Sequence, residues 1–230
     1  MASTYLELTN RVLRRLNEVE LTSSDFASPR GVHATVKDAV LDTVRKINNS
    51  KYKWPFNAQS GTQVLTIGQE LYALPSGIIA ADWESFQIEK DDTLNINHKH
   101  LKPINREEWY RTYRDLDLDA ETDGKTLPEF VFDGPNSTWG LTPSPDKAYT
   151  VNFKYWTSPT AISAHGDTVT IPDDFDYVIT AGALYHMYLF MDNNERTQLA
   201  KQAYDEGVKE MVNRYFKENR HHFTSKMVNL

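Results

Sequence analysis

The most regular stretch of the chain is residues 171–216, IPDDFDYVITAGALYHMYLFMDNNERTQLAKQAYDEGVKEMVNRYF. Pro172 presets the backbone angle of a first helical turn, and the aspartates after it place negative charge at the positive end of the helix dipole. Asn193 or Asn194 can cap a second helix after a connection of only a few residues. A turn that short joins antiparallel helices, so the stretch predicts a helical hairpin.

Apolar residues in both helices recur at three- and four-residue steps, which is the spacing of a buried helical face. The face expected on the first helix consists of Val178, Ala181, Leu184, Tyr185, Tyr188 and Leu189. The face expected on the second consists of Leu199, Tyr204, Val208, Met211 and Tyr215.

The segment after the hairpin, KENRHHFTSKMVNL at residues 217–230, is basic overall and carries only scattered apolar side chains. It can be a frayed terminus, or an arm that orders when it docks in a partner's groove. We expect the docking arm. Its candidate partner-binding residues are Arg220, His221, His222, Phe223, Lys226, Met227, Val228 and Leu230.

Two further helices are expected near the start of the chain. The first is capped by Ser3 and runs to Val19. The second begins at the Ser28-Pro29 pair and carries valines at four-residue steps as far as Ile47. Valine is a modest helix former, so burial against another helix must support this one.

From residue 54 to residue 156 the apolar pattern has a period of two, which is typical of strands. The expected strands are residues 63–67, 70–74, 83–89, 93–97, 129–133, 138–142 and 149–156. Gly68-Gln69 predicts a hairpin between the first two, and Asp91-Asp92 between the next two. Asn105, with Glu108 completing a capping box, begins a short helix that ends at Tyr113.

This order of elements predicts an α+β fold. Four long helices would form an antiparallel four-helix bundle, with a β-rich domain inserted between the second and third helices and an extended C-terminal arm. The expected division is residues 1–53 and 161–218 for the bundle, residues 54–160 for the insertion, and residues 219–230 for the arm.

Composition excludes several classes of protein. The 230 residues include no cysteine, which excludes disulfides, thiolate catalysis and Cys-ligated zinc. No apolar run reaches the length of a membrane span, and the N-terminus has no signal-peptide pattern. The net charge of -7 argues against a grip on the phosphates of duplex DNA, and ordinary solubility explains it most simply.

The search for a metal site yields two weak candidates. His98 and His100 could lie on one face of a strand, but no third ligand is evident. Counted from Asp119, Gly124 occupies the sixth position of a calcium loop, but Phe130 stands where the twelfth position needs a bidentate Glu. A solvated strand end and a flexible acidic loop are the expected interpretations.

Other charged groups also have simple explanations. Arg11, Arg14 and Arg15 could contact an acidic partner, although a solvated helix face is favoured narrowly. His186 lies among apolar neighbours, as expected of a hydrogen-bonded core or interface histidine. Carboxylate pairs are unspecific in a chain with 32 acidic residues. We predict no cofactor, no metal and no enzyme activity.

Three segments resemble the head-to-tail adaptors of short-tailed phages, a family also called tail tubular protein A. They are IPDDFDYVITAGALYHMYLFMDNNE, VNFKYWTSPTAIS and ELYALPSGI. The resemblance spans most of the chain. It implies a structural virion protein located in the neck of the particle, and in the host cytoplasm during assembly.

The resemblance also implies partners. The chain would form a homo-oligomeric ring, typically of twelve copies, between the portal and the tail nozzle. Residues 219–230 would dock into the portal, and the β-rich domain would face the nozzle, with the tail fibres as further candidate partners. DNA would pass through the lumen without specific binding, which an acidic wall favours. The arm would become ordered only when it binds the portal, so that rings do not form before the portal is present.

Two alternatives stay open from the sequence. Some related adaptors are linked to peptidoglycan hydrolysis, so a muramidase-like enzyme is one; it needs two carboxylates roughly 5 to 9.5 Å apart across a cleft. A small regulatory binding module is the other, and it would stay monomeric with every partner.

Overall fold

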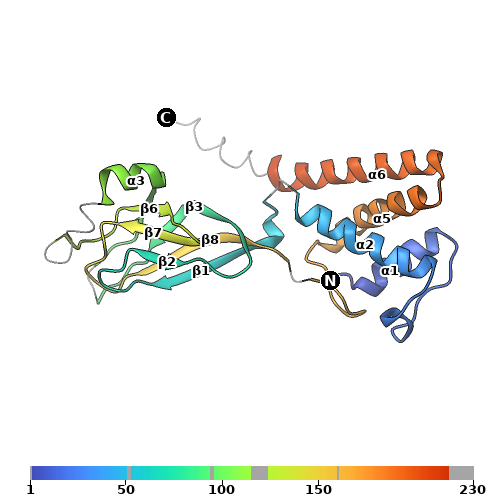
Figure 1. Ribbon diagram of the computed structural model, residues 1–230, viewed down its shortest axis with the longest axis horizontal. Coiled ribbons are helices and arrows are strands. Elements are labelled where there is room, and N and C mark those ends of the chain that lie inside the picture. Colours follow the sequence, from blue (N-terminus) through green and yellow to red (C-terminus); the bar gives the residue numbers. More distant parts are fainter. Residues whose placement is uncertain (1, 51–52, 94–95, 115–123, 160, 218–230) are drawn as a thin grey trace, which may run out of the picture. The chain divides into compact units, whose positions relative to one another are not determined.

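The helical pattern at both ends of the chain and the period-two pattern between them produce two separate units (Figure 1). The computed structural model describes residues 2–50, 53–93, 96–114, 124–159 and 161–217. The helical unit comprises Met1–Asn57 and Pro159–Leu230, and the β unit comprises Ala58–Ser158.

The α+β class is confirmed, but the antiparallel four-helix bundle is wrong. The described residues contain five α-helices and two four-stranded sheets. The helices of the helical unit are α1 (Tyr5–Arg15), α2 (Val32–Asn48), α5 (Asp176–Phe190) and α6 (Asn194–Val212), with 11, 17, 15 and 19 residues. Asn17 adopts a left-handed φ of 59°, so α1 ends well before Val19 and is too short to match the others. The fifth helix, α3 (Arg106–Thr112), belongs to the β unit.

The N-termini of α1 and α2 differ from the expected ones. Thr4, not Ser3, caps α1 through a capping box: its Oγ1 accepts from the Glu7 N–H at 3.2 Å, and the Glu7 carboxylate accepts from the Thr4 N–H at 2.8 Å. The second helix begins after Gly31 rather than at the Ser28-Pro29 pair. Gly31 adopts a φ of 56°, a conformation that favours glycine and separates the pair from the helix.

The C-terminal hairpin is present. A 3-10 turn, Asp173–Phe175, leads into α5, and the Asn193 side chain caps α6 by accepting from the Arg196 N–H at 3.1 Å. Helices α5 and α6 run side by side in opposite directions (Figure 1). The Tyr177 hydroxyl near the start of α5 donates to the Glu210 carboxylate near the end of α6, at 2.6 Å.

Two glycines allow α5 to pack closely on its neighbours. A Cβ at Gly182 would lie 2.4 Å from the Thr43 methyl carbon of α2 and 2.9 Å from the Tyr204 ring of α6. A Cβ at Gly207 would lie 2.7 Å from Val178. Helix α5 also contacts α1, so it is the central helix of the unit.

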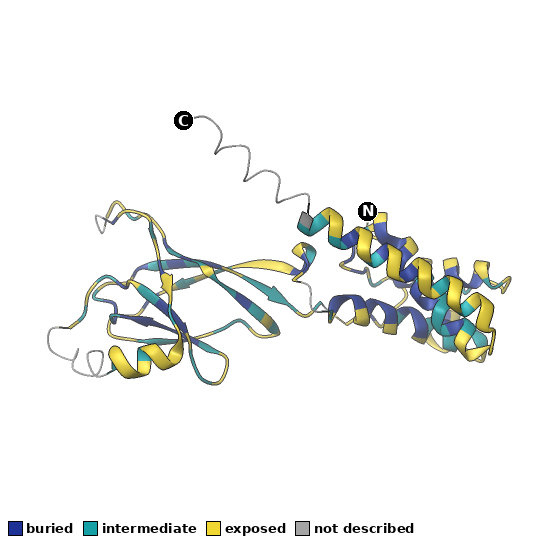
Figure 2. Cartoon of the chain, turned by 90° about the horizontal axis from the view of Figure 1, so that it is seen from above, coloured by how far each residue is buried: buried dark blue, intermediate teal, exposed yellow. Residues whose placement is uncertain are grey.

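The face that α5 buries only partly matches the expected one. Val178, Ile179, Gly182, Ala183 and Met187 are buried, whereas Leu189 is 53% exposed. On α6, Leu199 is 63% exposed, although Tyr204 and Met211 are buried as expected. The outer side of α6 is exposed along its length (Figure 2). Because α5 is apolar on all sides, its sequence did not indicate which residues face inward.

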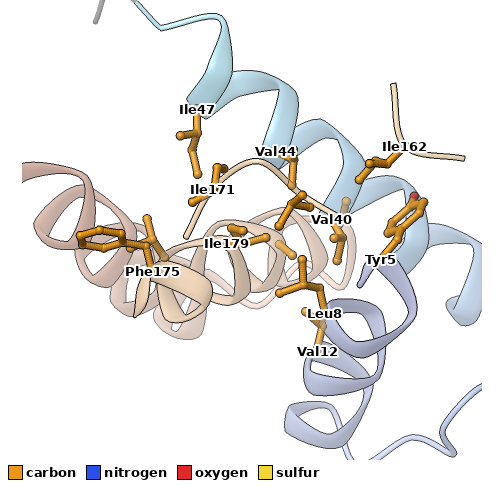
Figure 3. Packing of buried hydrophobic residues seen from close by; sticks show 14 of the residues in the cluster. Tyr5, Leu8, Val12, Val40, Val44, Ile47, Ile162, Ile171, Phe175 and Ile179 are labelled. Carbon is orange, nitrogen blue, oxygen red and sulfur yellow. The ribbon is translucent and has the colours of Figure 1, made fainter. Parts of the chain in front are cut away.

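The core of the helical unit joins side chains from both ends of the chain. Figure 3 shows Leu8 and Val12 of α1, Val40 and Val44 of α2, and Ile179 of α5 pointing toward one another. Ile162 and Ile171, from the segment before α5, complete the same cluster (Figure 3).

The β unit consists of two four-stranded sheets. One has the order β1-β8-β3-β4 and the other the order β2-β7-β6-β5. The strands are β1 (Ala58–Val64), β2 (Leu71–Ala73), β3 (Ile78–Ile88), β4 (Lys99–His100), β5 (Lys102–Pro103), β6 (Phe130–Asp133), β7 (Thr138–Thr142) and β8 (Thr150–Thr157). All neighbouring strands are antiparallel except β5 and β6. Phe86, Trp139 and Phe153 form the centre of the core, with Phe86 and Phe153 stacked at 4.7 Å.

Neither predicted hairpin pairs as expected. Strands β1 and β2 belong to different sheets, because β1 pairs with β8 and β2 pairs with β7. The chain crosses between the sheets at Gly68, whose N–H donates to the Pro145 carbonyl at 2.9 Å. Asp91 and Ile96 form only an isolated bridge, and β3 pairs with β4 instead.

The short helix α3 is present between β5 and β6. Asn105 caps it by accepting from the Glu107 N–H at 3.1 Å, in place of the expected capping box with Glu108. Trp109 stacks on Phe132 at 4.5 Å, which fixes the helix to its own unit.

Candidate interaction surfaces

The predicted docking arm lies outside the described residues. This applies to all of its candidate partner-binding residues, namely Arg220, His221, His222, Phe223, Lys226, Met227, Val228 and Leu230. The structure does describe the point from which the arm begins. There α6 continues into a π-helical turn, Asn213–Lys217.

An aromatic cluster fixes this turn to the helical unit. The rings of Tyr215 and Phe216 lie 6.2 and 5.7 Å from the Trp54 ring. Phe56 stacks on Trp54 at 5.5 Å and also contacts Tyr215, at 5.8 Å. The Trp54 side chain is 1% exposed, and its Nε1 donates to the Ile47 carbonyl at 2.9 Å. Aromatic pairs at these separations stabilise a structure beyond the area that they bury.

An ion pair supports the same turn. The Arg214 guanidinium lies 2.9 Å from the Asp174 carboxylate and 5.3 Å from the centre of the Phe175 ring. Tyr215 also contacts Phe175, at 5.9 Å. The residues before α5 and those after α6 therefore hold the base of the arm together.

The arginines of α1 lie at the rim of a surface hollow of about 530 Å³. Its lining residues are Arg11, Arg14, Arg15, Tyr177, Thr180, Ala181, Leu184, Ala200 and Ala203. Arg11 lies 2.8 Å from the Asp176 carboxylate, and Arg14 lies 2.9 Å from the Glu20 carboxylate. Arg15 makes no ion pair with a residue that the structure describes. Two of the three charges are thus balanced within the chain, which weakens the case for an acidic partner here.

Asp176 has a structural position beneath Arg11. It is 1% exposed and accepts a short hydrogen bond from the Ser3 hydroxyl. Burial raises the pKa of Asp176 above its ordinary value, although the Ser3 hydroxyl and Arg11 oppose the rise. The hydrogen bond between Ser3 and Asp176 joins the first residues of the chain to the start of α5. It explains why Ser3 is not available to cap α1.

The two predicted histidine ligands are neighbours in the β unit. The His98 and His100 rings lie 4.8 Å apart, and His98 Nε2 lies 2.8 Å from the Gln87 side-chain oxygen. Across residues 2–50, 53–93, 96–114, 124–159 and 161–217, no group of three or more His, Cys, Asp or Glu side chains could hold a metal ion. The two rings thus contact each other, and His98 makes a polar contact with Gln87.

The calcium-like loop and His186 are the remaining predicted sites. Asp119 and the rest of the calcium-like loop up to Asp123 lie outside the described residues, and Phe130 begins strand β6. His186 is half-buried on α5, 5.3 Å from the Tyr185 ring. Burial and the nearby Lys46 lower the pKa of His186.

A second hollow, of about 400 Å³, lies on the outer face of the β1-β8-β3-β4 sheet. Most of its lining side chains are polar, and the Thr62 hydroxyl donates to the Asn152 side-chain oxygen at 2.7 Å. Neither this hollow nor the one at α1 has an Asp or Glu among its lining residues. The two carboxylates of a muramidase are thus missing from both lining sets.

Comparison with protein families decides the class of the protein. The model of the family described as SU10 adaptor protein matches residues 3–226. The chain belongs to this family. The resemblance to phage head-to-tail adaptors is thereby confirmed, and the SU10 adaptor family indicates a structural role in the virion. A search among curated proteins found no match.

Two findings concern the proteins and membranes that this adaptor could meet. Its family implies association with other virion proteins in the neck and tail of the particle. In the described part of the chain, no helix is both long enough and apolar enough to span a bilayer.

The aromatic cluster was not recognised in the sequence. Trp54 and Phe56 were assigned to the β-rich segment, and Tyr215 to the buried face of a helix. The available signal was composition: aromatic residues are dense at 54–56 and again at 215–216, immediately beside the predicted ends of helices.

Proposed function

We propose that copies of this adaptor form a ring that joins the portal to the tail nozzle, with residues 219–230 docking on the portal. The observation that carries the proposal is the match to the adaptor family over residues 3–226, which includes much of the arm. A ring of twelve copies, as in the phages that the chain resembles, is part of the proposal. The β unit would face the nozzle and the fibres.

The aromatic cluster supports the role assigned to the arm. A docking segment transmits binding to the rest of a protein only if its base is fixed. Tyr215 and Phe216 are held against Trp54, and Arg214 is held by Asp174. Force applied through the arm would therefore act on the core of the helical unit.

The charge of the chain is compatible with the passage of DNA through the ring. Acidic residues outnumber basic ones, 32 to 25. A net negative wall repels phosphates, so DNA would slide past without being bound.

Binding to purified portal rings from the same phage tests the proposal. We expect the full chain to bind as a ring visible by electron microscopy, and a chain lacking residues 219–230 to stay folded and not bind. A truncated chain that binds as well as the full chain would overturn the role of the arm.

A charge-reversal pair keeps the test independent of truncation. Arg220→Glu with Lys226→Glu should weaken portal binding by at least about tenfold, because charged contacts in an interface depend on complementary sign. The matched control is Lys201→Glu with Lys209→Glu, two exposed positions on α6. If the control weakens binding equally, net charge rather than the arm is responsible.

A further inference from the structure

Strand β1 is an unprotected sheet edge. The strand has seven residues, AQSGTQV, and among the strands that the structure describes it pairs with β8 alone, along one side. Its register with β8 is continuous from Ala58 to Val64, so no bulge bends it away from a partner. Proteins usually protect edges with charged residues, proline, bulges or short length.

The other edges of the two sheets have such protection. Strand β4 has two residues, Lys99 and His100, and β5 consists of Lys102 and Pro103. Strand β2 has three residues. By contrast, no charged residue or histidine occurs anywhere between residues 54 and 69, in a chain of which 25% is charged.

The backbone groups of β1 that point outward can be identified. The Leu65 N–H donates to the Tyr149 carbonyl at 2.7 Å, so the odd-numbered residues of the strand face β8. The even-numbered residues Ala58, Ser60, Thr62 and Val64 therefore direct their N–H and C=O groups away from the sheet, and all four are exposed.

These outward groups have few partners. Within the described part of the chain, the N–H and C=O groups of Ser60 and Thr62 bond to no other segment. The Val64 carbonyl accepts only from the neighbouring Gln63 side chain, at 2.8 Å. At Thr66 the open edge ends, because the Tyr72 hydroxyl accepts from its N–H at 2.9 Å.

We propose that β1 of one copy pairs with β1 of a second copy, antiparallel about Gly61, to form one sheet across both copies. Bare N–H and C=O groups at an edge are complementary to another extended strand. The sequence makes the edge complementary to itself: Ser60 would stand opposite the partner's Thr62, and Ala58 opposite the partner's Val64. No charged side chain would meet its own copy, whereas like charges directly opposite destabilise a sheet.

Gly61 fits the position on the two-fold axis. Two strands approach most closely at a pair without backbone hydrogen bonds, which Gly61 and its copy would form. Beneath the strand, the Phe153 ring occupies the space of a Gly61 Cβ, at 2.6 Å. A two-fold contact produces pairs and not rings, so this contact is additional to those that would close a ring.

Cysteine cross-linking of the full chain, without portal, tests the register. The chain has no natural cysteine, so each variant contains one thiol. A mixture of Ser60→Cys and Thr62→Cys chains should form a disulfide-linked heterodimer under mild oxidation, because the two positions would be directly opposite, with Cα atoms about 5.5 Å apart. Each variant alone should cross-link several-fold less. Equal cross-linking in the mixture and in the single variants would overturn the proposal.

Sedimentation over a range of concentrations tests the pairing itself. The unmodified chain should dimerise, and Thr62→Lys should weaken the dimer by at least about tenfold, because lysine protects edges and the two copies of it would be diagonal neighbours. Gln198→Lys, an exposed position on α6, adds the same charge and should leave the dimer unchanged. Circular dichroism confirms that both variants are folded. A chain that stays monomeric, or a dimer insensitive to Thr62→Lys, would contradict the proposal even if portal binding is intact.

Discussion

The two units of the adaptor differ in how the terminal turn of one and the edge strand of the other are packed. In the helical unit, Tyr215 of the last described turn contacts the rings of Trp54, Phe56 and Phe175. In the β unit, strand β1 pairs with no other described strand along one of its sides. The first arrangement fixes a segment in place, whereas the second leaves backbone groups available to another chain. The contrast separates residues that stabilise the fold from residues that the proposed strand pairing would use.

The largest expected effect is the loss of the aromatic cluster. Trp54→Ala should lower the free energy of unfolding by about 3–5 kcal/mol, as for other buried tryptophans, because it leaves a cavity between α2 and the terminal turn. Urea denaturation measures it. Leu199→Ala, at a 63% exposed position, is the control and should stay within about 0.5 kcal/mol of the unmodified chain. Equal effects would show that the cluster does not fix the turn.

A smaller effect is expected where α5 approaches α2. Gly182→Ala should destabilise the protein by about 1–3 kcal/mol, because the added methyl overlaps Thr43 and Tyr204. Gly166→Ala is the matched control, since a Cβ there meets no atom within 4 Å. A stabilised Gly182→Ala variant would mean that the helices separate easily.

Removing one hydroxyl should lengthen the open edge. Tyr72→Phe deletes the group that accepts from the Thr66 N–H, so Thr66 would join the unpaired part of the edge. We expect a loss of about 0.5–1.5 kcal/mol in thermal or urea unfolding, and faster amide exchange at Thr66. The Leu65 amide, which bonds to Tyr149, should remain protected. Unchanged exchange at Thr66 would contradict the assignment of the edge.

The smallest effect concerns pH. Burial lowers the pKa of His186 below its ordinary 6.5, and Lys46 lowers it further. The unfolded chain therefore takes up a proton first, so the stability contributed by His186 is present above pH 6.5 and is lost as the pH falls toward the folded pKa. The melting temperature of His186→Gln should fall less than that of the unmodified chain between about pH 7.5 and pH 5.5. Parallel curves for both proteins would contradict the assignment.

Several elements could be predicted because local chemistry determines them. The Asn193 cap and strand β7, Thr138–Thr142, are located as expected. The pairing of β1 with β8 could not be predicted, because period-two patterns identify strands but not their partners. The end of α1 depends on the left-handed Asn17, which no apolar spacing reveals.

The sequence predicted the composition of the candidate docking arm, but it did not predict the aromatic cluster at the base of the arm. The basic, sparsely apolar tail was evident, but its residues from Glu218 onward lie outside the described part of the chain. The cluster at its base joins residues that are far apart in sequence, such as Trp54 and Tyr215. Such contacts follow from tertiary packing. The edge of β1 was likewise hidden by the wrong hairpin prediction.

Cryo-electron microscopy of the adaptor bound to its portal tests the proposed function most directly. We expect a ring of copies in which residues 219–230 of each copy contact the portal and each helical unit adjoins the next. Single copies scattered on the portal, or a ring that contacts the portal through the β unit with residues 219–230 facing away, would contradict the proposed docking.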